Sequence, residues 1–248
     1  MKWHFLTALR QGIRTRSIQI LIITGLLGVI VAYLASEFSG RPPATVALDV
    51  GLSGLRMVGV LLVLFWVQEL FARDVDRRVL FTTLSFPVPR SHYLLGRFGA
   101  VVALTLLAVA IFGGLITGLT WVATLGYSQP TPVNLGLPLF LTLAYTALDL
   151  ITVAGFTFLV ASLATTPYLP MILGLAFALA GRALFPTLAL LRGEHGVATG
   201  MKTTFGPVLD GLRWFLPDLS RLDIRPAALY GHWPDPEILL WGPVMVLG

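Results

Sequence analysis

Long apolar runs alternate with short polar connections along most of this chain. A helix of about 20 residues crosses a hydrocarbon layer of about 30 Å, and five runs reach or approach that length. Residues 238–248 form a shorter sixth run, which we expect to be the start of a helix that continues beyond this chain. The pattern therefore predicts an all-α membrane protein with six transmembrane helices, the last one incomplete, in a single transmembrane domain (1–248). The six predicted spans cover residues 18–35, 46–67, 98–121, 135–163, 168–191 and 238–248, and the fourth is long enough to tilt or break.

Composition strengthens the membrane prediction. Hydrophobic residues make up 56% of the chain and charged residues only 12%, against about 25% charged in soluble domains. The mean hydropathy is +0.84 and the net charge is +5. The basic residues lie beside the apolar runs, where they set orientation and meet anionic membrane lipid, so nucleic acid is not an expected partner. The chain has no cysteine, which excludes disulfides, thiolate metal sites and a cysteine nucleophile.

The distribution of lysine and arginine predicts the orientation of the spans. Cytoplasmic connections carry an excess of these residues. If the N-terminus is cytoplasmic, the first two outer connections hold only Arg41. The outer connection 192–237 is an exception because it carries several arginines, but these are offset by acidic residues. The cytoplasmic side then holds Lys2, Arg10, Arg14, Arg16, Arg73, Arg77, Arg78, Arg90 and Arg97.

Residues 1–17 have the pattern of an amphipathic helix. Phe5, Leu6, Leu9 and Ile13 fall on one helical arc and polar residues lie opposite, so we expect this helix to lie in the inner membrane interface. The alternative is a simple charged flank. A cleavable signal peptide is not expected, because the first apolar run is longer than about 15 residues and lacks a small-residue cleavage site.

The segment Glu69–Arg97 is the most charged interruption between two spans. Asp74 precedes Arg78 by four residues, which favours a short helix after the second span. Pro87 and Pro89 then forbid a regular helix, and a new helix can begin at Ser91, a good N-cap residue. The pattern predicts a helix, a rigid kink and a second helix. The alternative is an ordinary solvated loop.

Several residues in this segment carry a resemblance to a known family. Glu69, the charges that follow it, the run Leu84–Arg90 (LSFPVPR) and Tyr93–Arg97 (YLLGR) resemble the permease subunits of type-2 ATP-binding-cassette exporters, and the layout of spans is similar over the whole chain. In that family this connection is a coupling helix that docks on the ATPase subunit. The resemblance implies an ATPase contact formed by Glu69, Arg73, Asp74, Asp76, Arg77, Arg78 and Arg90.

The resemblance also implies partners and a location. Two copies of a cytoplasmic ATPase subunit would carry ATP and Mg, with no cofactor in this chain. A second permease copy or a paralogue would complete the pore in a bacterial cytoplasmic membrane. Export of a lipid-like or amphiphilic substrate is expected by analogy. The run Trp214–Asp223 resembles the outer loop of permeases grouped with copper-enzyme maturation and gliding systems, and we expect a helix over 205–215 near the outer leaflet.

Motifs for catalysis are not recognisable in the sequence. The nearest match to a phosphate-binding loop, Gly196–Thr203, misplaces its second glycine, so the chain is not expected to be an ATPase. His195 and His232 lack the spacing of metal ligands, and no metal site is predicted. The alternatives to a permease are an ion-coupled secondary carrier or the membrane anchor of an assembly machine. A carrier should show an internal repeat, and none is evident.

Four charged residues lie inside predicted spans: Asp49, Arg56, Asp149 and Arg182. Ionisable groups in hydrocarbon are costly unless paired or wet. Asp49 and Arg56 are seven residues apart on one helical face, so they can pair or line a path. Thr146 and Thr152 flank Asp149 at helical spacing. The four charges therefore predict either ion pairs that fix helix packing or a polar translocation path, whereas a proton relay would need more acids in series.

Small residues at helical spacing occur in two spans. Gly114 and Gly118 form a G-x-x-x-G pair in the third span, and Gly174 with Ala178 repeats the spacing in the fifth. Such faces allow close helix approach. We expect both pairs to pack within the chain.

Overall fold

The computed structural model describes residues 2–14, 17–72, 90–126, 133–164, 166, 168–192 and 217–233. Throughout these residues the regular structure is helical, as predicted. The elements are α1 (Lys2–Arg14), α2 (Ser17–Phe38), α3 (Pro43–Val67), the π-helical η1 (Gln68–Ala72), α6 (Arg90–Gly126), α7 (Leu137–Leu163), α8 (Leu169–Arg192), the 3-10 helix η2 (Leu219–Leu222) and α10 (Arg225–Tyr230).

Five of these helical stretches are long and apolar enough to cross a membrane: Gln19–Phe38, Pro43–Phe71, Ser91–Leu125, Leu137–Leu163 and Leu169–Thr187. They match the first five predicted spans to within a few residues, except that the third is longer. The fourth span is one unbroken helix, α7, rather than a broken one. The predicted sixth span at 238–248 lies outside the described residues. The chain is therefore an all-α protein with several apolar helices of transmembrane length.

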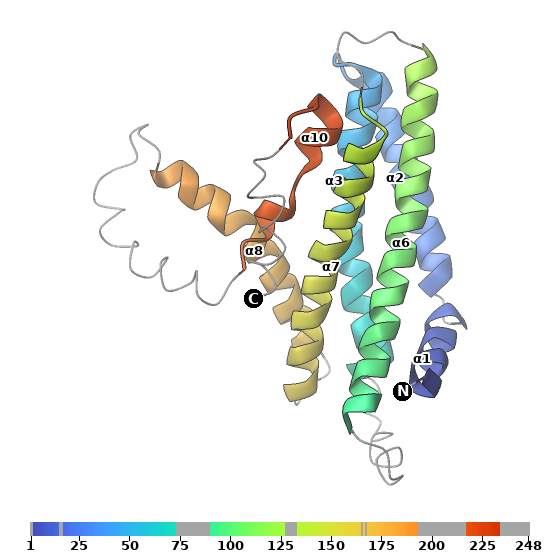
Figure 1. Ribbon diagram of the computed structural model, residues 1–248, viewed down its shortest axis with the longest axis vertical. Coiled ribbons are helices and arrows are strands. Elements are labelled where there is room, and N and C mark those ends of the chain that lie inside the picture. The colour runs from blue at the N-terminus through green and yellow to red at the C-terminus, as the bar shows by residue number, and fades with distance from the viewer. Residues whose placement is uncertain are drawn as a thin grey trace.

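Helix α3 is the centre of the bundle. It contacts α2, α6, α7 and α8, and its buried side chains include Leu48, Leu52, Val63 and Trp66. In Figure 1 the helices α2, α3, α6 and α7 stand side by side, while α8 leans away from the bundle. Phe156 of α7 and Phe177 of α8 stack with ring centroids 4.0 Å apart. Because α3 is covered on most sides, a polar residue on its buried faces must find its partners inside the protein.

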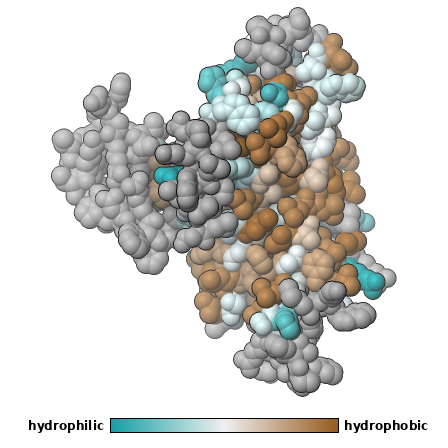
Figure 2. Space-filling model, in the orientation of Figure 1, coloured by the Kyte–Doolittle hydropathy of each residue, from teal (hydrophilic) through white to brown (hydrophobic). Residues whose placement is uncertain are grey.

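The bundle has two distinct ends in Figure 1. The upper end holds the α2–α3 connection and the start of α7, and the lower end holds α1, the end of η1 and the start of α6. Brown, hydrophobic atoms cover much of the visible face between the two ends in Figure 2. Ile22, Ile23 and Leu26 of α2 are each at least half exposed. Apolar side chains at such exposure suit contact with lipid tails rather than with water.

Helix α1 packs against α6 at the lower end. A methyl group placed on Gly12 would come within 2.6 Å of Leu104, and one placed on Gly99 would come within 3.5 Å of Phe5. Arg97 Nη1 donates a hydrogen bond of 2.8 Å to Gln11 Oε1. Leu6 and Ile13, two members of the predicted apolar arc, are each 43% exposed. The helix is present as predicted. Only part of its apolar arc packs against α6, because Leu6 and Ile13 stay partly exposed.

The helix of the second span does not stop at the end of α3. It continues through the π-helical residues Gln68–Ala72, and the next described residue, Arg90, begins α6 one residue before the predicted start. Glu69 is buried, with 8% of its surface exposed. It therefore does not lie on the surface, where the expected ATPase contact would need it. The predicted kink, and the expected contact residues Arg73, Asp74, Asp76, Arg77 and Arg78, lie outside the described residues. Arg90 lies at the first position of α6, and its side chain is not among those described.

The two small-residue pairs differ in their surroundings. A methyl group on Gly174 would lie 2.4 Å from Thr157 Oγ1 and 2.6 Å from Leu64 Cδ2, and Ala178 is 1% exposed. The predicted packing is confirmed for this pair. A methyl group on Gly114 or Gly118 would meet no atom within 4 Å in the described part of the chain. For that pair the prediction of packing within the chain is wrong, because this face of α6 points away from its neighbours.

The end of the long connection after α8 folds back into the bundle. Elements η2 and α10 contact α7, with η2 also against α8 and α10 against α3. Leu219, Leu222 and Ile224 are almost completely buried. Asn134 N donates to Ala228 O across 3.0 Å. Because residues 217–233 turn back against α3, α7 and α8, we call them the re-entrant segment. The expected helix over 205–215 lies outside the described residues.

Candidate functional site

Asp149 is the deepest charge in the described structure. It lies midway along α7 and is 0% exposed. Its Oδ2 accepts from Arg56 Nε at 2.7 Å and from Arg182 Nη2 at 2.6 Å. Its Oδ1 has no hydrogen-bond partner among the described residues. One buried carboxylate therefore joins α3, α7 and α8, and it faces two arginines rather than one.

Arg56 links this buried carboxylate to the re-entrant segment. Its Nη1 lies 2.8 Å from Asp223 Oδ2, and its Nη2 donates to the Leu219 carbonyl oxygen at 2.9 Å. With Nε bound to Asp149, all three nitrogens of the guanidinium have acceptors. A guanidinium near the middle of a span is costly unless paired, and the re-entrant segment supplies two of its three partners. The re-entrant segment therefore completes the site instead of merely covering it.

Arg225 closes the network on the side of the upper end. Its Nε and Nη2 hold the two carboxylate oxygens of Asp223 at 2.7 and 2.6 Å, a bidentate arrangement. Its Nη1 contacts Asp49 Oδ1 at 3.3 Å and also donates to Ser53 Oγ. The hydrogen bond to Asp223 raises the pKa of Arg225 despite burial. Burial alone would raise the pKa of Asp223, but the hydrogen bond from Arg225 and the charges of Arg56 and Arg225 lower it below its ordinary value.

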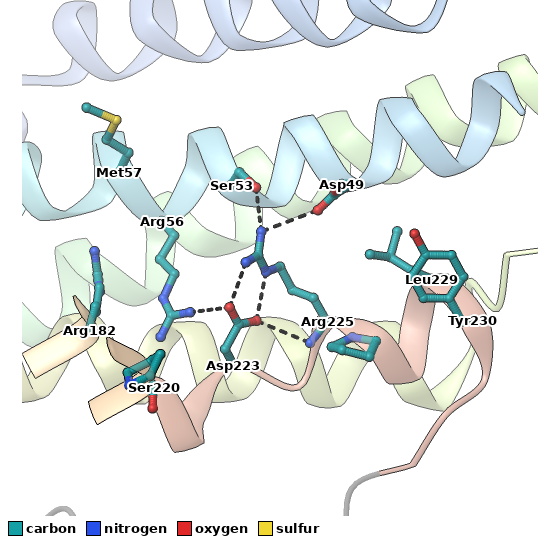
Figure 3. A pocket seen from close by; sticks show the side chains of 12 residues that line it. Asp49, Ser53, Arg56, Met57, Arg182, Ser220, Asp223, Arg225, Leu229 and Tyr230 are labelled. Carbon is teal, nitrogen blue, oxygen red and sulfur yellow. Dashed lines mark hydrogen bonds and ion pairs between the residues drawn. The ribbon is translucent and has the colours of Figure 1, made fainter. Parts of the chain in front are cut away.

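A cavity of about 700 Å³ lies beside this network. Figure 3 shows Arg56 and Arg182 toward one end of it and Asp49 with Tyr230 toward the other. Its lining comes from α3, α8, η2 and α10 and includes the apolar side chains of Met57, Pro186 and Leu229. Asp149 does not line the cavity. The space is thus bordered by both charged and apolar side chains.

One alternative that the sequence offered for these charges is wrong. Asp49 and Arg56 lie on the same helix but do not pair with each other: Asp49 pairs with Arg225, and Arg56 pairs with Asp149 and Asp223. The hydroxyls of Thr146 and Thr152, which flank Asp149, donate to the carbonyls of Thr142 and Leu148 one turn earlier. Asp149 instead finds its partners on other helices, and the predicted interhelical ion pairs are present.

Four groups of this network were not predicted from the sequence: Ser53, Asp223, Arg225 and the Leu219 carbonyl. Asp223 and Arg225 were counted only as part of an outer connection whose charges offset one another. A usable signal was present, because Leu219, Leu222 and Ile224 are interspersed with the charged residues Asp218, Arg221, Asp223 and Arg225. Such alternation suits a segment that buries one side and offers charges to another. The four in-span charges balance in sign, so they gave no reason to look for further partners.

Replacing Asp223 by asparagine tests how much the re-entrant segment depends on this carboxylate. Charge-assisted hydrogen bonds contribute about 1.5–3 kcal/mol each, so the variant should unfold at a clearly lower temperature near neutral pH. The folded-state pKa of Asp223 is below its ordinary value of 3.8. Its stabilisation is therefore fully present above the ordinary pKa and is lost as pH falls through the folded pKa.

The measurement is thermal unfolding of both proteins in detergent between neutral pH and about pH 3. The difference in Tm between wild type and Asp223→Asn should stay constant down to about pH 4 and shrink below it. Subtracting the variant removes the contribution of the other carboxylates. If the difference in Tm already shrinks between about pH 7 and about pH 5, the stabilisation does not depend on a carboxylate with a lowered pKa.

Comparisons with models of known protein families and with curated proteins gave no match to this chain.

Proposed function

We propose that this chain is the permease subunit of an ATP-binding-cassette transporter. A separate ATPase subunit, present in two copies, hydrolyses ATP and docks on the charged segment 69–97 from the cytoplasm. A second copy of this chain or a paralogous permease completes the pore in a bacterial inner membrane, with the N-terminus cytoplasmic. The transported substrate is lipid-like or amphiphilic and is moved outward.

The observation that carries this proposal is the charged segment between the second and third spans. Its flanking elements, η1 and α6, contact each other and both contact α1 at the lower end. The lysine and arginine distribution favours a cytoplasmic location for this end. The resemblance of residues 69–97 to the coupling segment of type-2 exporter permeases points to the same role.

Helix α6 suits the transmission of a push from an ATPase. It runs unbroken for 37 residues from Arg90 to Gly126, so a displacement at its lower end moves the whole helix. Near that end, Arg97 bonds to Gln11 of α1 and lies 5.4 Å from the Tyr93 ring centroid. The π-helical residues of η1 add support, because π-helical turns are frequent at functional sites.

Two features favour an amphiphilic substrate. The cavity beside α3 offers charged groups to a polar head, and Met57 at its edge is 71% exposed. Much of the visible face of the bundle is apolar (Figure 2), which suits an acyl or isoprenoid chain. A polar group and an apolar chain can thus be accommodated side by side.

Charge reversal in the segment tests the proposal. The double variant Arg77→Glu and Arg78→Glu should insert in the membrane normally but lose its ATPase partner, because like charges at an interface cost several kcal/mol. Purification in mild detergent from the native host should recover a soluble ATPase with the wild-type chain and at least about tenfold less with the variant.

The matched control is Arg221→Glu, which reverses an exposed arginine of η2, outside the segment 69–97 (45% side-chain exposure). This variant should retain the ATPase. The proposal fails if no ATPase accompanies the wild-type chain, or if the double variant retains the ATPase and transports normally.

A further inference from the structure

The charges that line the cavity do not cancel. Arg56, Arg182 and Arg225 line it together with Asp49 and Asp223, which gives three positive charges, two negative charges and a net charge of +1. The third carboxylate, Asp149, balances this excess only from behind the wall, where it is 0% exposed. A molecule inside the cavity therefore meets a surface with one more cation than anions.

The three arginines differ in how many of their nitrogens have protein acceptors. All three nitrogens of Arg56 and of Arg225 have protein acceptors. Arg182 donates only from Nη2, to Asp149, and its Nε is buried without a partner among the described residues. A guanidinium carries five N–H donors, so most donors of Arg182 are left over. Its side chain is 20% exposed, and it lines the cavity.

The backbone beside Arg182 is also irregular. Pro186 follows Arg182 by one helical turn inside α8 and also lines the cavity. Proline has no N–H to donate to the carbonyl one turn earlier, which here belongs to Arg182. The helix is therefore locally weakened next to the arginine with spare donors.

The geometry points to a binding site for a singly charged oxyanion, a carboxylate or a phosphodiester, held by Arg182 at the deep end of the cavity. One negative charge cancels the net charge of the lining, whereas two would leave it negative. Arginine binds carboxylates and phosphates through paired N–H donors. Met57 at the cavity edge is 71% exposed, so the anion can belong to a membrane lipid or to a soluble molecule. The site does not depend on the proposed ATPase partner.

Thermal unfolding of the purified chain in a neutral detergent tests this site. Dimethyl phosphate and acetate serve as soluble probes, and phosphatidylglycerol in mixed micelles serves as the lipid probe, with phosphatidylcholine as its neutral counterpart. Sodium chloride at equal ionic strength corrects for screening. A ligand that binds only the folded state stabilises it by RT ln(1 + [L]/Kd), so Tm keeps rising with the logarithm of the ligand concentration above Kd. The wild-type chain should be stabilised by at least one of the anionic probes, with a concentration dependence of this form.

Arg182→Gln should weaken the apparent affinity by at least about tenfold, because hydrogen bonds to charged groups contribute about 1.5–3 kcal/mol. The fold should survive this change, since Asp149 keeps Arg56. Arg182→Lys retains the charge but not the paired donors. Its apparent affinity should lie between that of the wild-type chain and that of Arg182→Gln. Arg221→Gln, on the re-entrant segment but outside the cavity lining, should bind as wild type does.

The lipid and soluble probes separate the two sources of the anion. Tighter binding of phosphatidylglycerol than of dimethyl phosphate assigns the site to a lipid headgroup, and the reverse order assigns it to a soluble anion. The inference is overturned if no anionic probe stabilises the wild-type chain beyond sodium chloride. It is also overturned if the probes stabilise wild type and Arg182→Gln equally.

Discussion

Replacing Asp149 by asparagine is expected to destabilise the protein more than any other single change to the ion-pair network. Asparagine keeps the shape of the side chain but removes the buried negative charge that faces Arg56 and Arg182. Breaking a buried ion pair by removing one partner costs about 3–5 kcal/mol. The variant should show a large drop in Tm in detergent and a reduced yield of monodisperse protein in size-exclusion chromatography.

The structure also predicts which second change rescues this variant. Without the Asp149 charge, Arg56 still has Asp223, whereas Arg182 has no other carboxylate partner among the described residues. Adding Arg182→Gln should therefore recover a substantial part of the lost stability. Adding Arg56→Gln should not, because Arg182 remains unpaired and the re-entrant segment loses its anchor.

Asp49→Asn is the matched control for this series. Asp49 carries the same charge, but its side chain is 50% exposed and its contact with Arg225 is 3.3 Å long. Exposed ion pairs contribute about 0–1 kcal/mol, so this variant should unfold close to wild type. If Asp149→Asn also unfolds like wild type, or if both second changes rescue it equally, the buried carboxylate does not hold the three helices together.

The membrane-spanning architecture was predictable because hydrocarbon imposes a simple requirement. Every backbone group in it must be paired within its own helix, so an apolar run of sufficient length has one structure available. The runs 18–35 and 135–163 accordingly correspond to α2 and α7. The start of α6 next to Ser91 followed from the prolines before it, which act locally. Such features need no knowledge of what the helix packs against.

The partners of the in-span charges were not predictable on the same grounds. Arg56 pairs with a residue 93 positions away on α7 and bonds to a carbonyl 163 positions away on η2. Helical spacing suggested Asp49 instead, since both side chains lie on one face of one helix. In the folded chain Arg56 does not pair with Asp49, because the re-entrant segment brings Asp223 and the Leu219 carbonyl to it. Only the three-dimensional path of the connection after α8 determines that choice.

The glycines illustrate the same limit at smaller scale. Gly114 with Gly118 and Gly174 with Ala178 have the same spacing, and the sequence offered no reason to separate them. Their surroundings differ because α8 reaches the bundle on the Gly174 side, where Thr157 and Leu64 approach closely. The α6 pair faces away from the described helices. Small residues four positions apart predict a helix face without large side chains. They do not predict whether another helix packs against that face.

Gly174→Leu should therefore have the second largest effect on stability. Even the first added carbon would lie 2.4 Å from Thr157 Oγ1 and 2.6 Å from Leu64 Cδ2. Thr157 cannot swing away easily, because its hydroxyl donates to the Val153 carbonyl at 2.7 Å. Overpacking a close contact costs about 1–3 kcal/mol. Displacing α8 also pulls Arg182 away from Asp149, so the effect of this substitution should reach the ion-pair network.

Gly118→Leu is the control that separates this clash from any general effect of a larger residue in a span. It makes the same change at the same spacing, but no atom of the described chain lies within 4 Å of the added carbon. Gly118→Leu should unfold near the wild-type Tm, and Gly174→Leu well below it. Because the loss in Gly174→Leu passes partly through Arg182, its energetic cost should shrink when Asp149→Asn is already present. Fully additive costs would mean that α8 is positioned independently of the Asp149–Arg182 pair.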